Sequence, residues 1–485
     1  MGPGSRARGA AQQTAAQLVV ALSGYVTAVI LARALGPAAF GAYGIVYSVL
    51  LSVEIVGRLG LPQAITKLVA ERDAASRTAT EATGTTLAAI GYLVLFAGFV
   101  LASPWLGRVL NVPDGARLFM IAALDIPFYG LFLVAHAVLT GRGNFAAAAG
   151  ITVVYAAAKA LGILAMALIG ITIEVALYVN AAGSAVGLLA ALAATGRQSW
   201  LPSLGAAGRI LKLALPVSMR GVASQILGNF GLWAIGMAAA FMPADAAGLY
   251  SAAGSVARLP VIVALAMTGI TTAGVAAARA RGDLEGARAV VAGASRGLLV
   301  LLLPASLFVA VDAAELMTLF FARSYAGGGE LLAIQVPGRG MAFSYLLVLT
   351  SALIGASQAR AAALLSWGAV ALGIASAALL IPWLGAAGAA WATTIGCIGG
   401  AVAAGVLCHR HFGPLLSAKE VATTLLASAP VVALAAMLPA MHGLAYLAVL
   451  AGLGALQLAL LALAGLVRAS DLRELLRPSP KAARG

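Results

Sequence analysis

The chain has 485 residues, of which 62% are hydrophobic and 9% are charged, and its mean hydropathy is +1.01. Soluble proteins carry about 25% charged residues, so this composition excludes a soluble globular protein. A net charge of +14 would suggest nucleic-acid binding in a soluble chain. In a membrane protein it raises the question of which side of the membrane holds the positive charge.

Apolar segments long enough to cross a bilayer, which takes roughly 20 residues each, occur along the whole chain. In chain order they are 11–34, 41–66, 82–107, 117–140, 145–169, 173–195, 209–241, 246–275, 291–311, 330–355, 360–381, 384–408, 421–440 and 444–467. We therefore predict an all-α polytopic membrane protein with about 14 transmembrane helices. Arg6 and Arg8 before the first segment also fit a signal peptide. We expect this segment to be retained, because an internal repeat uses it as its first helix.

The basic residues favour one side of the membrane. With the N-terminus in the cytoplasm, the predicted inner segments hold 21 Lys and Arg, against four in the outer loops. The four outer residues are Arg33, Arg108, Arg117 and Arg323. This bias follows the positive-inside rule, so we expect a multi-pass protein of the cell (inner or plasma) membrane with both termini cytoplasmic. The positive charge then faces anionic lipid, and no nucleic-acid partner is needed.

Two stretches of the first half recur weakly in the second. Pro37–Tyr43 resembles Pro243–Tyr250 at an offset of 206 to 207 residues, and Leu139–Asn144 resembles Leu353–Gln358 at an offset of 214. Each offset holds six spans, so the copies share one orientation and predict two six-helix lobes related by a pseudo-two-fold axis along the membrane normal. The predicted parts are an N-terminal lobe 1–200, a C-terminal lobe 201–412, two extra spans in 413–470 and a cytoplasmic tail 471–485.

Charged residues inside the predicted spans are the main functional signal. The basic ones are Arg58, Lys159, Arg220, Arg258 and Arg339. A charge at the bilayer centre costs at least ~2.5–3.5 kcal/mol, and such residues usually face a water-filled cavity. Only two acids, Glu54 and Asp125, lie as deep, which leaves a positive excess. We expect these side chains to line a cavity that receives an anion, although Lys159 could instead reach a membrane interface.

Proline lies close to each of the four intramembrane arginines. In Val336–Met341 the sequence VPGRGM places Arg339 among residues that interrupt helices, because proline removes a backbone hydrogen bond. Broken helices at membrane depth are tolerated where they line protein or water. Glu54 and Arg58 lie four residues apart, which also allows them to neutralise each other on one helix face.

The candidate enzymatic and metal motifs are weak. Gly327–Gly329 has neither the lysine nor the serine of a phosphate-binding loop. Cys397 and Cys408 suggest neither a disulfide framework nor a metal site. His409 and His411 are two residues apart and so do not share a helix face. We expect a protein that is not an enzyme and that needs no cofactor.

Leu31–Tyr43, LARALGPAAFGAY, followed by Arg58–Gln63, RLGLPQ, resembles the start of the polysaccharide-transporter branch of the multidrug/oligosaccharidyl-lipid/polysaccharide exporter superfamily. Leu379–Ala389 also resembles that branch, and the resemblance covers about 11–410. It implies two six-helix lobes around a cationic lumen and alternating access that moves a lipid-linked oligosaccharide outward. The four intramembrane arginines match those of the family only in kind. The first span lacks the opening typical of peptidoglycan-precursor flippases, which counts against that branch.

The resulting hypothesis is a flippase for a polyprenyl-diphosphate-linked glycan. The five intramembrane basic residues would hold the diphosphate, because guanidinium and ammonium groups match phosphate. Gln225, Asn229 and Tyr129 would meet sugars, and Glu54 and Asp125 are candidates for coupling to protons or sodium, unless the membrane potential alone drives transport. The alternatives are a multidrug exporter of the same superfamily and a non-transporting partner of glycan polymerases or glycosyltransferases.

Overall fold

The computed structural model describes residues 3–58, 60–71, 74–196, 203–437 and 443–466. Within these residues the secondary structure is helical and no strand occurs. The chain forms two compact units. Unit 1 comprises the residues up to Asn229 together with Gly236–Gly248, and unit 2 comprises Phe230–Ile235 with the described residues from Leu249 onward. The predicted tail 471–485 lies outside the described residues, and the predicted lobe boundaries stay a prediction.

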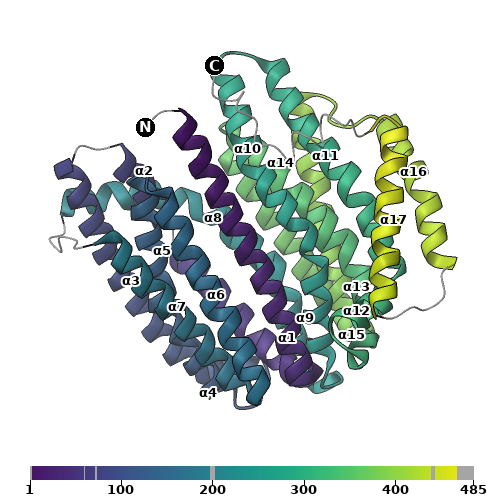
Figure 1. Cartoon of the computed structure of the whole chain (residues 1–485), viewed down its shortest axis with the longest axis horizontal. Helices are drawn as coiled ribbons and strands as arrows, with labels where there is room; N and C mark the ends of the chain where they lie inside the picture. The colour runs from purple at the N-terminus through teal and green to yellow at the C-terminus, as the bar shows by residue number, and fades with distance from the viewer. Residues whose placement is uncertain (1–2, 59, 72–73, 197–202, 438–442, 467–485) are drawn as a thin grey trace. The chain divides into compact units, whose positions relative to one another are not determined.

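Unit 1 is built from long helices that pack side by side (Figure 1). They are α1 (Pro3–Arg58), α2 (Leu61–Ala70), α3 (Ala74–Val109), α4 (Gly115–Ala123), α5 (Asp125–Gly141), α6 (Phe145–Ile169), α7 (Ile173–Thr195) and most of α8 (Leu204–Met237), followed by the short η1 (Ala239–Phe241). α5 contacts α2, α3, α6 and α7, so it lies at the centre of the unit. Its buried face packs Phe132 and Leu139 against Ile151 of α6 and Leu188 of α7.

Unit 2 has a similar helical construction. Its elements are α9 (Ala246–Ala257) from Leu249, α10 (Leu259–Ala280), α11 (Leu284–Val311), α12 (Ala313–Phe320), η2 (Arg323–Gly328), α13 (Gly329–Gln335), η3 (Val336–Ala342), α14 (Phe343–Gly355), α15 (Ala359–Phe412), α16 (Ala418–Met437) and α17 (Gly443–Leu463). α14 packs against α10 and α15, whereas α16 packs against α11 and α17. The two extra spans are attached through apolar contacts such as Phe308 with Val431 and Leu453.

Within the described residues, most of each predicted membrane segment falls in helix. Ten helices of the described part are long and apolar enough to cross a membrane, and Ala448–Leu463 is a shorter apolar helix. Two of the ten hold two predicted segments each, because α1 bends at Gly36 (φ 75°) and α15 bends at Gly385 (φ 56°). The all-helical membrane fold is thereby confirmed. The count of fourteen spans and the two-fold symmetry stay predictions.

Four of the charged residues expected inside spans lie where helices are interrupted. Arg58 is the last residue of α1, and Gly60, with φ 72°, precedes α2. Asp125 is the first residue of α5, and Arg258 caps the start of α10. Arg339 lies in η3, a π-helical turn, which confirms the break expected from VPGRGM. Irregular backbone at membrane depth is tolerated only where it lines protein or water, so these positions favour a polar site.

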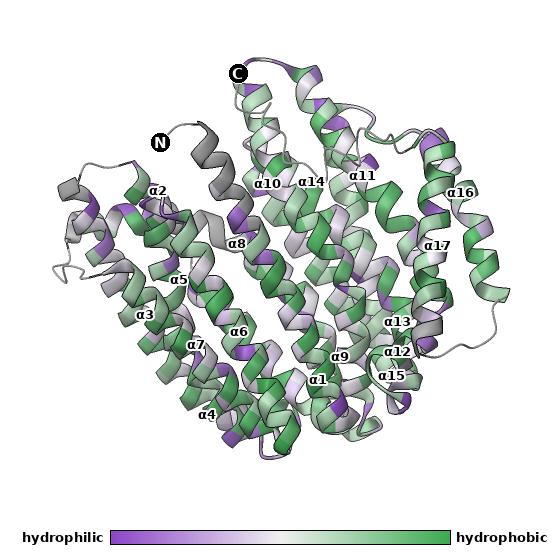
Figure 2. Ribbon diagram, in the orientation of Figure 1, coloured by the Kyte–Doolittle hydropathy of each residue, from purple (hydrophilic) through white to green (hydrophobic). Residues whose placement is uncertain are grey.

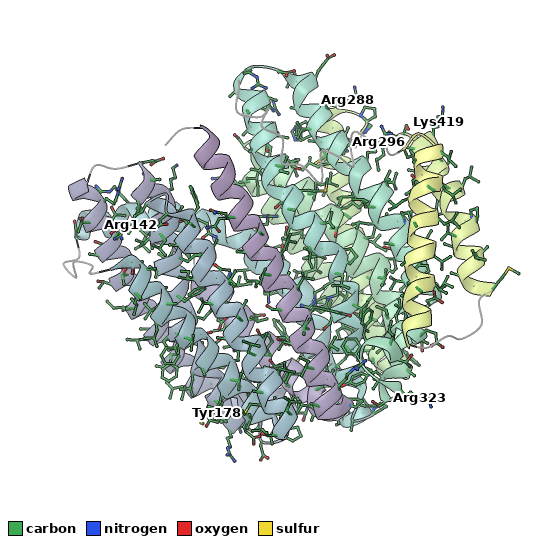
Figure 3. The ribbon with its side chains drawn as sticks, viewed as in Figure 1. Arg142, Tyr178, Arg288, Arg296, Arg323 and Lys419 are labelled. Carbon is green, nitrogen blue, oxygen red and sulfur yellow. The ribbon has the colours of Figure 1, made fainter. Side chains whose placement is uncertain are left out.

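Polar residues gather at the helix ends of each unit, and hydrophobic residues cover the lengths between them (Figure 2). In unit 2, Arg288, Arg296 and Lys419 lie at one end and Arg323 lies at the other, as the predicted loop alternation requires (Figure 3). In unit 1, Arg142 and Tyr178 lie at opposite ends. The assignment of one end of each unit to the cytoplasm stays a prediction.

Candidate functional site

A cluster of charged and aromatic side chains is buried inside unit 1. It joins Arg58 of α1 with Asp125 and Tyr129 of α5 and with Tyr155 and Lys159 of α6. Residues four apart on a helix project from the same face, so each of α5 and α6 contributes one neighbouring pair. Three residues expected at a substrate site, Arg58, Lys159 and Tyr129, are thus brought together with the expected coupling residue Asp125.

Lys159 and Asp125 form an ion pair at the centre of the cluster. The Nζ–Oδ2 distance is 3.7 Å, and the two side chains are 14% and 3% exposed. Asn180 of α7 donates from Nδ2 to the same carboxylate oxygen at 2.8 Å. The Lys159 ammonium also lies 4.5 Å from the ring centroid of Tyr155, within the range of a cation–π contact. Lys159 therefore points into the protein and not toward a membrane interface.

Arg58 contacts an aromatic ring and not its neighbouring acid. Its Nη2 donates to the Tyr129 hydroxyl at 3.1 Å, and its guanidinium carbon lies 5.3 Å from the Tyr129 ring centroid. No ion pair within the described part of the chain joins Arg58 to Glu54. The Arg58 guanidinium lies against the Tyr129 ring. That Glu54 and Arg58 neutralise each other on one helix face stays a prediction.

Glu54 is 1% exposed and faces the same cluster. Its carboxyl lies beside Asp125 and Lys159. Both Glu54 carboxyl oxygens and Asp125 Oδ1 are buried and have no hydrogen-bond partner among the described residues. Two carboxyl groups this close share a single ammonium as their nearest counter-ion, so Glu54 and Asp125 form one coupled acidic site.

A second cluster lies inside unit 2 around Arg339, which is 4% exposed. Its Nη1 donates to Gln335 Oε1 at 3.2 Å, and its guanidinium carbon lies 5.9 Å from the Tyr250 ring centroid. Gln335 in turn donates from Nε2 to the Tyr250 carbonyl at 3.4 Å. Arg258 is exposed, and its Nε donates to the carbonyl of Gly254 at 3.1 Å. A Cβ on Gly254 would lie 2.5 Å from Arg339 Nη1, so both arginines pack around this glycine.

The three remaining expected residues share helix α8. Asn229 is 4% exposed and donates from Nδ2 to the carbonyl of Gln225 at 3.1 Å. Gln225 and Arg220 are half-buried. No described contact joins Gln225 or Asn229 to the Arg58–Lys159 cluster, so their part in sugar binding stays a prediction.

Sequence reasoning missed Tyr155, Asn180, Gln335 and Tyr250. Two of them carry a local signal, because Tyr155 and Gln335 each precede a buried cation by four residues and so share its helix face. Asn180 and Tyr250 reach their partners from other helices, across 55 and 85 residues of sequence. No group of three metal-ligating side chains gathers within the described ranges.

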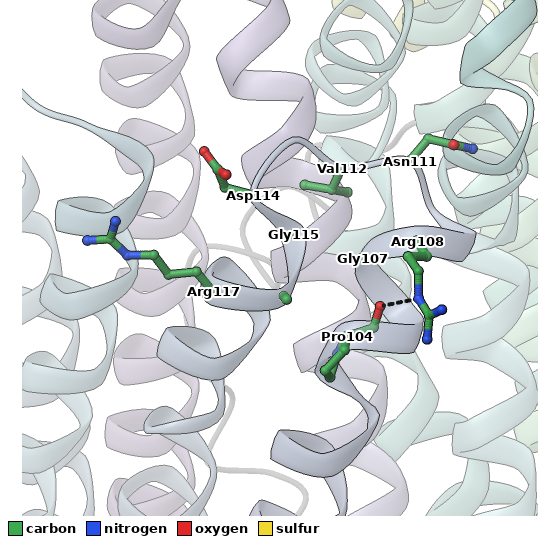
Figure 4. A pocket seen from close by; sticks show the side chains of 9 residues that line it. Pro104, Gly107, Arg108, Asn111, Val112, Asp114, Gly115 and Arg117 are labelled. Carbon is green, nitrogen blue, oxygen red and sulfur yellow. Dashed lines mark hydrogen bonds between the residues drawn. The ribbon is translucent and has the colours of Figure 1, made fainter.

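A surface pocket of about 510 Å³ opens in unit 1 between the end of α3 and the start of α4 (Figure 4). Its lining residues include Arg108, Asp114 and Arg117. Arg108 donates from Nε to the carbonyl of Pro104, in its own helix, at 3.2 Å. Both arginines were expected in outer loops, and neither belongs to the buried cluster.

Sequence comparison finds one family. The family described as polysaccharide biosynthesis protein matches residues 30–327, which is more than half of the chain. No curated protein sequence matches the chain.

Solved structures of three transporters share the fold. The lipid II flippase MurJ in an inward closed conformation is 14% identical, with a TM-score of 0.75 over 95% of this chain and 99% of that one. An inward-facing multidrug resistance MATE family transporter is 15% identical, with a TM-score of 0.71 over 82% of this chain and 95% of that one. A transporter from Pyrococcus furiosus is 16% identical, with a TM-score of 0.62 over 86% and 97%. The family match thereby confirms the sequence resemblance to polysaccharide biosynthesis proteins, and the solved structures share the fold.

Proposed function

We propose, from the premise that the chain belongs to the polysaccharide biosynthesis protein family, that it is a flippase for a polyprenyl-diphosphate-linked oligosaccharide. The protein would carry this lipid from the inner to the outer leaflet of the cell membrane by alternating access. It would act as a transporter and not as an enzyme. Enzymes of glycan assembly, such as polymerases or glycosyltransferases, would make or use its cargo.

One observation carries the proposal: two half-buried cations of unit 1 share one aromatic ring. Arg58 and Lys159 lie 5.3 and 5.5 Å from the Tyr129 ring centroid. The buried Nε of Arg58 has no hydrogen-bond partner among the described residues. An unsatisfied buried donor is costly, and a guanidinium fork matches phosphate oxygens. A diphosphate would satisfy this donor and place its negative charge beside both cations.

Further donors would complete substrate binding. Arg258 and Arg339 of unit 2 and Arg220 of α8 are proposed to bind the diphosphate during the transport cycle. Gln225, Asn229 and Tyr129 are proposed to meet sugars, because amides and phenols hydrogen-bond to hydroxyl groups. The polyprenyl chain would remain in the lipid, where burying each CH₂ is favourable by about 0.8 kcal/mol.

The membrane potential favours the proposed direction. With the cell interior negative, moving an anion outward is downhill by ~2.3 kcal/mol per charge per 100 mV. An empty cationic site would be drawn back inward by the same field. The coupled acids Glu54 and Asp125 would allow proton or sodium movement to contribute.

A multidrug exporter is the second candidate, because the buried Glu54 and Asp125 could attract a cationic compound. Uptake of a cationic dye into inverted vesicles separates the two functions. Dye transport that depends on both acids would favour the drug exporter.

Reconstituted vesicles test the proposed function. Purified protein is incorporated with a fluorescent polyprenyl-diphosphate glycan, and its arrival in the other leaflet is followed by access of an impermeant quencher. We expect Arg258→Ala/Arg339→Ala to abolish the protein-dependent rate while the variant keeps the wild-type unfolding temperature. Normal transport by the double variant would exclude these arginines from the mechanism.

A further inference from the structure

Lys159 is held loosely by its acidic partner. Its Nζ lies 3.7 Å from Asp125 Oδ2, beyond the 2.7–3.2 Å range of an N–H···O hydrogen bond. The same oxygen accepts a closer bond, 2.8 Å, from Asn180. Besides this pair and the nearby Glu54 carboxyl, the ammonium lies against the rings of Tyr155 and Tyr129, 4.5 and 5.5 Å from their centroids. Aromatic faces attract a cation without accepting a conventional hydrogen bond, so the three donors of Lys159 remain available.

Helix α7 supports the two partners separately. Asn180 holds the Asp125 carboxylate, whereas Gly183, less than one turn later, lies against the aliphatic stem of Lys159. A Cβ on Gly183 would collide with Lys159 Cγ, so this glycine makes room for the lysine stem. Asp125 therefore keeps its own support if the ammonium moves away. The Lys159 side chain is also not sealed, because 14% of its surface is exposed.

The second cation beside Tyr129, Arg58, forms no direct ion pair with an acid among the described residues. Arg58 donates to the Tyr129 hydroxyl at 3.1 Å, and its Nε lacks a partner among the described residues. An anion bound at Arg58 would therefore lie beside the same ring that Lys159 contacts. A phosphate is a stronger partner for an ammonium than a carboxylate 3.7 Å away that is already hydrogen-bonded to an amide.

We propose that Lys159 is a counter-ion switch: it neutralises Asp125 in the empty protein and transfers to the diphosphate of a bound substrate. This proposal rests on the proposed function. It adds that Asp125 and the diphosphate compete for the Lys159 ammonium. Asp125 lowers the affinity for the diphosphate because it must give up Lys159 when the anion binds. The site then exchanges one ion pair for another, so the buried ammonium keeps a counter-ion in both states.

A double-mutant cycle tests the competition. The probe is farnesyl diphosphate, titrated against the detergent-purified full-length protein, the variants Asp125→Asn and Lys159→Met, and the double variant. We expect D125N to bind about tenfold more tightly and K159M about tenfold more weakly, within the usual 5–150-fold range of coupled sites. In the K159M background, D125N should change the affinity less than twofold.

Other outcomes overturn the switch. An equal gain from D125N with and without Lys159 would mean that Asp125 acts only as a distant negative charge. An unchanged affinity in D125N would mean that no competition exists. If K159M alone fails to fold, D125N and the double variant carry the test, because neither leaves a charged acid at position 125. The switch then requires the double variant to bind about tenfold more weakly than the wild type, and a double variant that binds like the wild type or like D125N contradicts it.

The matched control separates this proposal from the proposed function. Arg58→Ala should weaken farnesyl diphosphate binding in every background. If the wild type binds no diphosphate, or binds it independently of Arg58, the proposed function fails. If binding depends on Arg58 but D125N has no effect, only the switch fails.

Discussion

Arg58 donates a hydrogen bond to the Tyr129 hydroxyl at 3.1 Å, although its nearest acid in sequence, Glu54, lies one helical turn away. This contact is a hydrogen bond and not an ion pair, so the guanidinium can still pair with an external anion. Lys159 lies on the same Tyr129 ring at 5.5 Å from its centroid. Tyr129 thus holds two cations together at a depth where either alone would be costly.

Substitutions of Tyr129 should lower the affinity for diphosphate by different amounts. Tyr129→Phe keeps the ring and both cation–π contacts but removes the hydrogen bond to Arg58, so we expect a loss of only a few-fold. Tyr129→Ala removes both contacts, and we expect a loss of tenfold or more. Titration with farnesyl diphosphate measures both variants. The control is Tyr178→Phe at a half-exposed position, which should bind like the wild type. Equal losses for the two Tyr129 variants would exclude a role for the ring.

Gly254→Ala should displace the Arg339 guanidinium. The new methyl group would lie 2.5 Å from Arg339 Nη1 and 3.1 Å from Gln335 Oε1. A hydrogen bond to a charged group contributes about 1.5–3 kcal/mol, so we expect transport and diphosphate affinity to fall by roughly tenfold or more.

Gly269→Ala is the matched helical control for that change, because a Cβ on Gly269 meets no atom within 4 Å. Alanine favours a helix over glycine by about 1 kcal/mol, so this control should be slightly more stable and fully active. Wild-type binding by Gly254→Ala would show that the position of Arg339 does not matter.

Arg142 and Glu81 should contribute to the stability of unit 1. Arg142 donates to both carboxylate oxygens of Glu81, at 2.8 and 2.6 Å, and to the Thr195 carbonyl at 2.8 Å. The hydrogen bond to Glu81 raises the pKa of the Arg142 guanidinium. Arg142→Ala would leave the nearly buried Glu81 without its partner, at a cost of about 2–3 kcal/mol.

The unfolding temperature in detergent measures this loss. Arg142→Lys should recover little of it, because lysine has no bidentate fork. The exposed Arg108 contacts only a carbonyl of its own helix, so Arg108→Ala should stay within about 0.5 kcal/mol of the wild type. Equal stabilities of Arg142→Ala and Arg108→Ala would contradict the assignment.

Ser417 and Glu420 should fix the start of α16. Backbone N and Oγ of Ser417 donate to Glu420 Oε2 at 2.8 and 2.9 Å, and the Glu420 amide donates back to Ser417 Oγ at 3.2 Å. Such a capping box is worth about 1 kcal/mol, so Ser417→Ala should lower the unfolding temperature. Thr423→Ala, at an exposed position in the next turn, should not. A stable Ser417→Ala protein would show that packing against α11 holds α16 without the cap.

The helices and their interruptions were predictable because their causes are local. Hydrophobicity over about 20 residues marks a span, and proline removes a backbone hydrogen bond wherever it stands. The turn around Arg339 therefore followed from nearby residues, whereas the break after Arg58 lies inside the predicted span 41–66 and was not predicted. Local spacing did not predict the hydrogen-bond partner of Arg58. Its guanidinium donates to Tyr129, which lies 71 residues away in sequence.

The contacts of Lys159 could not be read from the sequence. Asp125, Lys159 and Asn180 come from three helices, and no regular spacing relates them. The sequence shows that the predicted spans hold more basic than acidic residues. Which of the basic groups form ion pairs, and which keep unused hydrogen-bond donors, depends on tertiary packing. Tyr155 could have been proposed, because it lies one turn from Lys159 on the same helix face.

Native mass spectrometry of the purified protein with polyprenyl-diphosphate glycans tests the central claim most directly. The comparison includes wild type, Arg58→Ala, Arg258→Ala/Arg339→Ala, and a polyprenol glycan that lacks the diphosphate. The account predicts that the wild type retains the diphosphate lipid, that both variants lose most of it, and that the uncharged lipid binds poorly to all three. Equal retention of charged and uncharged lipid, or retention that does not depend on the arginines, would contradict a cationic site for the diphosphate.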